Sequence, residues 1–159
     1  QDCSQVVLTF GNYGHQYARG RGFSDEVIVS CGNFLGFALE KVLALGFEKV
    51  IIIGELGKLA KVAGGIFLTD SRIADARMEI LASFAALFGV KQTTIARIFQ
   101  ASLTEEVLGY LEEEGVSLLE FGNFVAARTK KRVMEHTQGR VTVVVEVFSL
   151  KRGFLGRAE

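Results

Sequence analysis

The sequence of 159 residues contains no proline, only two cysteines and two histidines, and no excess of charge of either sign. Two cysteines, Cys3 and Cys31, are too few for a disulfide framework, so a reducing compartment, the cytoplasm, is expected. Because 18 basic residues balance 18 acidic residues, the chain has no electrostatic footprint for nucleic acid or an anionic membrane. No apolar run approaches the ~18 residues of a membrane span. We therefore expect neither nucleic acid nor a membrane as a partner.

Several common chemical motifs are also missing. His15 and His136 lie too far in sequence from each other and from the cysteines for a zinc site, so no protein metal site is expected. The segment "GELGKL" lacks the spacing and the Ser or Thr of a phosphate-binding P-loop, and no Gly-x-Gly-x-x-Gly dinucleotide motif occurs. No Gly-x-Ser-x-Gly nucleophile turn occurs either, which leaves a hydrolase triad unsupported.

What the sequence does contain is an alternation of strand-like and helix-like segments. Short, β-branched runs typical of strands buried on both faces lie at 6–10, 27–31, 50–53 and 141–148. Helical patterns lie at 33–45 with Asn33 as N-cap, at 71–88, at 102–115 behind a Ser102–Glu105 capping box, and at 117–136. This alternation predicts an α/β fold, Rossmann-like, with a mostly parallel sheet covered by helices on both faces, in one three-layer domain over residues 1–159.

Three of the predicted strands run directly into glycine, at Gly11, Gly32 and Gly54. The turns that follow parallel strands gather at the carboxyl edge of the sheet, where ligands of open α/β sheets bind. Glycine permits close approach of a ligand, and a following helix offers free N–H groups to an anion. Gly-Asn also makes ordinary turns, so for one such turn the structural interpretation is favoured. With three turns together, we give a ligand-binding edge and plain turns equal weight.

The segment "TDSRIADAR" raises a separate question, because its four charged residues open an apolar helical pattern. At 100° per residue, Arg72, Asp75 and Glu79 share one polar face, whereas Arg77 falls among apolar positions. Helix-spaced ion pairs on a solvated face explain the first three equally well. A buried guanidinium cannot lose its charge, so Arg77 needs either a carboxylate partner, Glu55 or Asp70, or an anionic ligand.

The segments "VVLTFGNYG", "CGNFLGFALEKVLALGFEKVIIIGELGKLAKVAGGIF" and "TDSRIADARMEILASFAALFG" resemble the C-terminal half of the CbiD family. The similarity is ordered and strong over residues 6–89 and weaker beyond, up to "VFSLKRGFLG". The resemblance implies an S-adenosylmethionine-dependent methyltransferase that acts on carbon 1 of cobalt-precorrin-5B in anaerobic cobalamin biosynthesis. Cobalt would arrive inside the corrinoid substrate.

The resemblance also implies roles for residues of the predicted sheet edge. Methyl transfer depends mainly on holding donor and acceptor in line. Donor contacts are expected from glycine-turn N–H groups and a carboxylate, and the corrinoid's acetate and propionate groups suit basic residues, with Arg19 and Arg21 as further candidates. The expected cofactor-binding residues are Gly11, Asn12, Gly14, Asn33, Gly54, Glu55 and Gly57. The expected substrate-binding residues are Lys58, Lys61, Thr69, Asp70, Ser71, Arg72, Asp75 and Arg77.

The sequence departs from the family pattern at two of these positions. Glu55 and Asp70 stand where the family usually has histidine, and the family's N-terminal half is absent from this sequence. The alternative interpretation is therefore a non-catalytic ligand-binding or interaction half that needs the missing half for activity. The intact "GKLAK" and "RIADAR" favour the enzyme, whereas the two acidic replacements favour the alternative. Association with a second copy of the chain also stays open.

Overall fold

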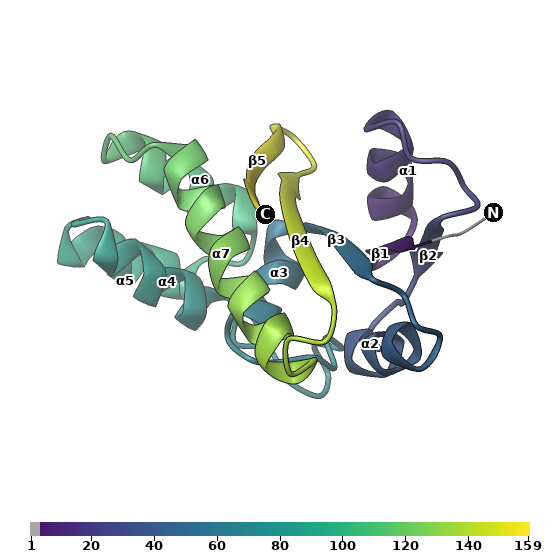
Figure 1. The fold of residues 1–159 in the computed structure, drawn as a ribbon. Helices are drawn as coiled ribbons and strands as arrows, with labels where there is room; N and C mark the ends of the chain where they lie inside the picture. Colours follow the sequence, from purple (N-terminus) through teal and green to yellow (C-terminus); the bar gives the residue numbers. More distant parts are fainter. Residues whose placement is uncertain (1–3) are drawn as a thin grey trace.

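The computed structural model describes residues 4–159, which form one five-stranded sheet flanked by helices (Figure 1). The strands are β1 (Gln5–Thr9), β2 (Ile28–Ser30), β3 (Lys49–Glu55), β4 (Thr142–Ser149) and β5 (Gly153–Ala158). Their order in the sheet is β2-β1-β3-β4-β5, with the first four parallel and β5 antiparallel to β4. This is the doubly wound order 2-1-3-4-5 rather than the 3-2-1-4-5-6 order of a dinucleotide-binding Rossmann sheet.

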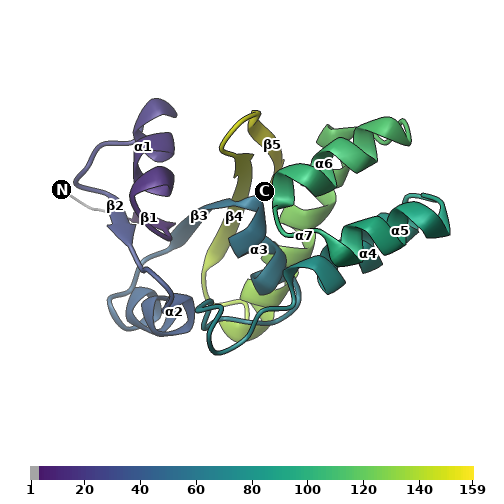
Figure 2. The same ribbon diagram turned by 180° about the vertical axis from the view of Figure 1, so that it is seen from behind.

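Helices cover both faces of the sheet, as the sequence predicted. The helices are α1 (Asn12–Gly20), α2 (Leu35–Ala44), α3 (Leu56–Ala63), α4 (Arg77–Leu87), α5 (Gln92–Gln100), α6 (Thr104–Glu113) and α7 (Leu118–His136). Helix α1 packs alone on one face, and α2, α3 and α7 pack on the other (Figures 1 and 2). Helices α4, α5 and α6 extend from that second layer, away from α1 and α2. Within residues 4–159, no helix combines the length and apolarity needed to cross a bilayer.

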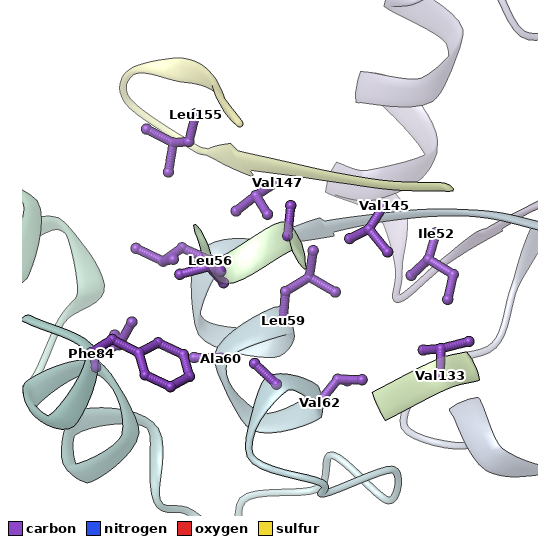
Figure 3. Packing of buried hydrophobic residues seen from close by; sticks show 14 of the residues in the cluster. Ile52, Leu56, Leu59, Ala60, Val62, Phe84, Val133, Val145, Val147 and Leu155 are labelled. Atoms are coloured by element: carbon purple, nitrogen blue, oxygen red, sulfur yellow. The ribbon is translucent and has the colours of Figure 1, made fainter. Parts of the chain in front are cut away.

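The strand residues alternate between the two helical layers. Val7 and Ile51 join Ala18 of α1 in the smaller apolar cluster, whereas Leu8 and Ile52 face the larger cluster under α2, α3 and α7. Figure 3 shows this larger core: side chains from β3, α3, α4, α7, β4 and β5 meet around α3. Burial on both faces explains why these strands read as continuous apolar runs.

The helix predicted at 71–88 is shorter than expected, because α4 begins only at Arg77. The carboxylate of Asp70 accepts a hydrogen bond from the Arg72 amide (2.9 Å), and that of Asp75 accepts one from the Arg77 amide (3.4 Å). Aspartate side chains that bind the backbone two residues onward favour turns over helix. The polar face inferred from a continuous helical wheel is therefore wrong for the residues before Arg77.

Two predicted caps also differ from the structure. Helix α2 begins at Leu35 with Phe34 as its N-cap, so the Asn33 side chain is free for other contacts. At α6 the carboxylate of Glu106, not Glu105, accepts the amide hydrogens of Ser102 (2.9 Å) and Leu103 (2.8 Å). Helix α7 begins behind Ser117, whose hydroxyl accepts the Glu120 amide hydrogen, close to the predicted start.

Candidate functional site

A crevice opens at the carboxyl edge of the sheet between the turns that follow β1 and β3. Helix α1 leaves β1 toward one face and α3 leaves β3 toward the other, so the two chains diverge at this topological switch point. The cavity there measures about 200 Å³. It is lined by Phe10, Gly11, Asn12, Tyr13, Gly14, Gly54, Glu55, Lys58, Phe148 and Leu150.

The three strand-to-glycine turns lie at one edge of the sheet, as the sequence predicted. In the parallel register Thr9 is aligned with Ser30 and with Ile53, so Gly11 and Gly32 follow aligned strand ends and Gly54 lies beside them, one residue before the end of β3. Gly54 has a packing requirement, because an added Cβ would lie 2.8 Å from Leu59 Cγ and 2.9 Å from Phe10 Cε2. Its missing side chain lets the crevice wall and α3 close over the end of β3.

Gly11 and Gly14 differ in what their missing side chains permit. A Cβ at Gly11 would meet nothing within 4 Å, so a larger residue there would extend into open space at the crevice. A Cβ at Gly14 would lie 3.1 Å from Thr9 Cβ, so this glycine allows α1 to pack on β1. Since Gly11 caps α1 without a side-chain hydrogen bond, N–H groups of the first turn are available to an anion.

Glu55 lies on the crevice wall with a fixed carboxylate. It is the N-cap of α3, where its Oε2 accepts the Gly57 amide hydrogen at 2.8 Å. Its Oε1 accepts a hydrogen bond from the Thr104 hydroxyl, also at 2.8 Å. Each carboxylate oxygen can accept a second hydrogen bond, so Glu55 keeps acceptor capacity for a ligand hydroxyl. Thr104 lies at the start of α6, and no local sequence pattern connects it to Glu55.

Arg77 lies behind Gly57 and is paired with Asp75. Its Nε and one terminal nitrogen donate to the two Asp75 oxygens, both at 2.9 Å. The guanidinium, hydrogen-bonded to Asp75, lowers the pKa of that carboxyl below its ordinary value. The prediction of a carboxylate partner for Arg77 is thus confirmed, whereas the named partners, Glu55 and Asp70, are wrong. The side chain of Arg77 is 33% exposed, so the pair is neither fully buried nor free in solvent.

A lysine cluster joins three segments beside the crevice: the turn at Asn33, helix α3 and residues 69–71. Lys58 Nζ donates to Asn33 Oδ1 (2.9 Å) and to the Thr69 carbonyl (3.3 Å), and Thr69 Oγ1 donates to Asn33 Oδ1 (3.2 Å). Lys61 Nζ donates to the same Thr69 carbonyl (3.0 Å) and to Ser71 Oγ (2.8 Å). We call Asn33, Lys58, Lys61, Thr69 and Ser71 the lysine cluster. It brings together five residues that the sequence assigned to ligand binding.

Lys61 is the buried centre of this cluster. The residue is only 1% exposed, and within residues 4–159 no carboxylate oxygen lies in salt-bridge contact with its ammonium. Burial lowers the pKa of the Lys61 ammonium below its ordinary value, and the Asp75 carboxylate opposes that shift. A buried ammonium held by a carbonyl and a hydroxyl fixes the 69–71 segment against α3. Lys58, by contrast, also lines the crevice.

The outermost predicted site residues are Asp70 and Arg72. Arg72 donates to Asp70 through Nε (3.1 Å) and a terminal nitrogen (2.7 Å), yet its side chain is 89% exposed. The hydrogen bonds from Arg72 lower the pKa of the Asp70 carboxyl to about 2. The further candidates Arg19 and Arg21 are paired elsewhere: Arg19 with Asp25, and Arg21 with the buried Glu146 of β4.

The structure thus groups the predicted residues into three neighbouring sets: the crevice, the lysine cluster and the two Asp-x-Arg pairs. Sequence reasoning missed Phe148 and Leu150, which reach the crevice from the end of β4, and Tyr13, which follows Asn12. Only the strand order could have revealed the β4 residues, because β4 lies beside β3 in the sheet but far from it in sequence.

Comparison with protein families identifies the chain. A family model described as "CbiD, C-terminal domain" matches residues 68–159, which is more than half of the sequence. The chain belongs to the CbiD family. The resemblance is thereby confirmed: the family model covers "TDSRIADARMEIL" and the weaker part beyond it as far as β5, and the relatives below cover the glycine turns as well.

Curated relatives in the CbiD family are each named cobalt-precorrin-5B C(1)-methyltransferase. A protein of Thermoanaerobacter sp. (strain X514) is 42% identical over 154 residues, which cover 97% of this chain and 42% of the relative. A protein of Thermosipho africanus is 38% identical over 156 residues, which cover 98% of this chain and 43% of the relative. A protein of Methanocaldococcus jannaschii is 40% identical over 136 residues, which cover 85% of this chain and 37% of the relative. The chain therefore spans about two fifths of these relatives, at their C-terminal part. No solved structure matches it significantly.

Proposed function

We propose that this protein is the part of a cobalt-precorrin-5B C1-methyltransferase that holds the methyl donor, S-adenosylmethionine, beside the corrinoid. The observation that carries the proposal is the crevice at the switch point between β1 and β3, lined by glycine turns and Glu55. Ligands of doubly wound sheets bind at such crevices. Family membership and the names of the relatives support the same reaction.

The groups around the crevice fit the chemistry of the donor. The uncapped first turn of α1 behind Gly11 suits a carboxylate, the spare acceptor capacity of Glu55 suits ribose hydroxyls, and Phe10 and Phe148 offer apolar walls. The cavity of about 200 Å³ is smaller than the roughly 300–1,000 Å³ of a complete ligand pocket. It would hold part of the donor, with the remainder lying along the open edge. When bound, the donor supplies the methyl group.

The charges of "TDSRIADAR" would meet the corrinoid. The carboxylates around a corrin ring suit an exposed guanidinium, and Arg72 presents one at the sheet edge while Asp70 holds its fork in place. Lys58 lines the crevice while its ammonium is held in the lysine cluster, so it would sit between donor and corrinoid. Lys61 would act as a positioning residue, because its ammonium is enclosed by Thr69 and Ser71.

Methyl transfer would require the longer chain of the family. The matched part is 42% of the Thermoanaerobacter protein, so more than half of that relative lies outside the match. Neither the crevice nor the Asp-x-Arg pairs enclose a space large enough for a corrinoid, and in the proposed enzyme the other part would close over it. The part described here would then supply donor binding and the first contacts to the corrinoid carboxylates.

The experiment that tests this proposal is calorimetric titration of the chain with S-adenosylhomocysteine, the product form of the donor. Gly11→Leu places a side chain in the crevice without backbone strain, because Gly11 has an extended conformation and open space around it. Gly109→Leu is the matched control, since a Cβ there also meets nothing within 4 Å and the site lies in α6. We expect at least a tenfold loss of affinity for Gly11→Leu and none for Gly109→Leu. Absence of binding by the unmodified chain, or equal affinities of both variants, would overturn the donor assignment.

A further inference from the structure

A second cavity, larger and of different character, lies on the α2 side of the sheet, where it reaches Cys31 and Phe34 on either side of Gly32. It has a volume of about 670 Å³ and runs between α2 and the strands β1 and β2. Its walls are apolar, with Val29 on β2 and Phe34, Phe37 and Leu45 along α2. The one charged side chain in it, Lys41, places its ammonium 5.1 Å from the centre of the Phe37 ring. We call this the α2 groove.

The apolar side chains of the α2 groove are exposed to an unusual degree. Phe37 is 60% exposed and Leu45 74%, and Phe34 and Val29 beside them are also exposed. Contiguous apolar surface of this kind on a folded protein marks a contact with another protein segment or a membrane. The membrane is disfavoured, because among residues 4–159 only Lys41 lines the groove as a cation, and the acidic Glu40 lies on α2 and Glu48 just beyond it.

The neighbouring strand β2 is also incomplete as part of a sheet. It has three residues, it stands first in the strand order, and on its outer side no strand among residues 4–159 pairs with it. Such an edge offers unpaired backbone groups unless another segment covers it. In this protein the unpaired edge and the apolar groove adjoin each other, because Val29 belongs to both.

The chain reaches the sheet beside this groove. The Ser4 carbonyl accepts hydrogen bonds from the amides of Glu48 (2.9 Å) and Lys49 (3.0 Å), next to Phe47, which lines the groove. In the curated relatives the matched part is the C-terminal part, and more than half of each chain precedes it. In those relatives the preceding part would join this fold near the position of Ser4, within a few residues of an exposed apolar surface.

We propose that the α2 groove and the edge of β2 form the docking surface for the part of the CbiD chain that precedes the matched region. The occupant is an apolar segment of that part, which seats its side chains among Phe34, Phe37 and Leu45 and covers the edge of β2. The inference depends on where the chain enters and which surface is left apolar. It is independent of the crevice, so it stands whether or not the crevice binds the methyl donor.

The test uses two matched pairs of exposed apolar residues in a longer chain. The matched region of the Thermoanaerobacter protein is replaced by this chain, and Phe37→Ser and Leu45→Ser are compared with Phe99→Ser and Leu87→Ser. The controls are 58% and 72% exposed, against 60% and 74% in the groove, but they lie on α5 and α4. We expect both groove variants to lower the Tm of the chimera by about 5 °C and the controls to leave it unchanged. In the chain of 159 residues alone, all four variants should leave the Tm unchanged.

A second format covers the case of a chimera that does not fold. The preceding part of the Thermoanaerobacter protein is co-expressed as a separate chain with the tagged chain of 159 residues. Affinity purification then measures how much of the preceding part stays bound to the unmodified tagged chain and to its Leu45→Ser and Leu87→Ser variants. The docking surface is supported if the unmodified chain and Leu87→Ser both retain the preceding part and Leu45→Ser does not. Equal behaviour of groove and control variants, or absence of retention by the unmodified chain together with an unfolded chimera, overturns it. A dimer of the isolated chain in sedimentation that only Leu45→Ser dissociates would assign the groove to a second copy and overturn it as well.

Discussion

The segment "TDSRIADAR" contains two Asp-x-Arg pairs with the same spacing and nearly the same geometry, placed in different surroundings. In both, the aspartate accepts the backbone amide and the guanidinium fork of the arginine two residues onward. In the outer pair the Arg72 side chain projects into solvent from a largely covered Asp70, whereas both members of the Asp75–Arg77 pair are about one third exposed and lie against Gly57 and near Glu55. The local Asp-x-Arg sequence determines the hydrogen-bonded geometry of each pair, whereas the surrounding elements determine how much each pair contributes to stability.

The largest effect is expected when the inner pair is broken. Arg77→Met keeps most of the side-chain volume but removes the partner of Asp75. We expect the free energy of unfolding to fall by about 1–2 kcal/mol. This value lies between the contribution of an exposed ion pair, about 0–1 kcal/mol, and the cost of breaking a buried one, about 3–5 kcal/mol. Urea unfolding measures this loss. The double variant Asp75→Asn/Arg77→Met should recover part of it, and additive losses would show that the pair is not coupled.

A smaller effect is expected from the hydroxyl that holds Glu55 beside the inner pair. Thr104→Val keeps the shape of the side chain but removes the hydrogen bond to Glu55 Oε1. Because the acceptor is charged and partly buried, we expect a loss of about 1 kcal/mol in the free energy of unfolding. If Glu55 binds the donor, Thr104→Val also lowers the affinity for S-adenosylhomocysteine. Thr104→Ser keeps the hydroxyl, so it should keep both the stability and the affinity of the unmodified chain. An unchanged stability of Thr104→Val would show that the contact does not constrain Glu55.

The outer pair should appear mainly in the dependence of stability on pH. The pKa of Asp70 is about 2 in the folded protein, against 3.8 ordinarily. A carboxyl whose folded-state pKa is depressed stabilises the fold above the unfolded pKa, and this contribution is lost as the pH falls from about 4 to about 2. We expect the Tm of Asp70→Asn to lie slightly below that of the unmodified chain at pH 5 and to meet it at pH 2. The difference should shrink in 0.5 M salt, since the guanidinium of Arg72 is exposed.

The smallest effect on stability is expected from Arg72→Met. Its guanidinium is almost wholly in solvent, so the Tm at pH 7 should not change measurably. Under the proposed function, however, Arg72 contacts the corrinoid, so binding of a cobalt corrin with free carboxylates should weaken severalfold in a chain that contains the preceding part. Lys91→Met is a control with one charge fewer at an exposed site beyond α4. If both variants weaken corrin binding equally, the effect of Arg72→Met comes from the change in net charge and not from a direct contact.

The sheet and its edge could be predicted from the sequence because their signals are local. Buried parallel strands give continuous apolar runs, and Gly11, Gly32 and Gly54 mark where each strand ends. The strand order and the antiparallel direction of β5 could not be predicted, because pairing between β3 and β4 joins segments separated by five helices. For the same reason Phe148 was not expected in the crevice.

The start of α4 shows a different limit. The apolar periodicity of residues 71–88 is helical, but the side chains of Asp70 and Asp75 bind backbone amides and hold residues 71–76 in turns. Periodicity alone cannot reveal this competition. Lys61 shows the same limit. Its charge predicted a contact with a ligand, but its ammonium donates to the Thr69 carbonyl and the Ser71 hydroxyl. These contacts form only when α3 packs against residues 69–71, so the sequence alone could not reveal them.

The pairing of β3 with β4 also has a consequence for synthesis of the protein. Ile53 of β3 is aligned with Glu146 of β4, so the central sheet is completed only after the seven helices have been made. Until β4 leaves the ribosome, the apolar strand β3 presents an open edge to solvent and to other nascent chains. Such long-range parallel pairing is slow, and its intermediates aggregate readily. We therefore expect the emergence of β4 to limit the yield of native protein during translation, because a chain that ends before residue 142 leaves its central strand unprotected.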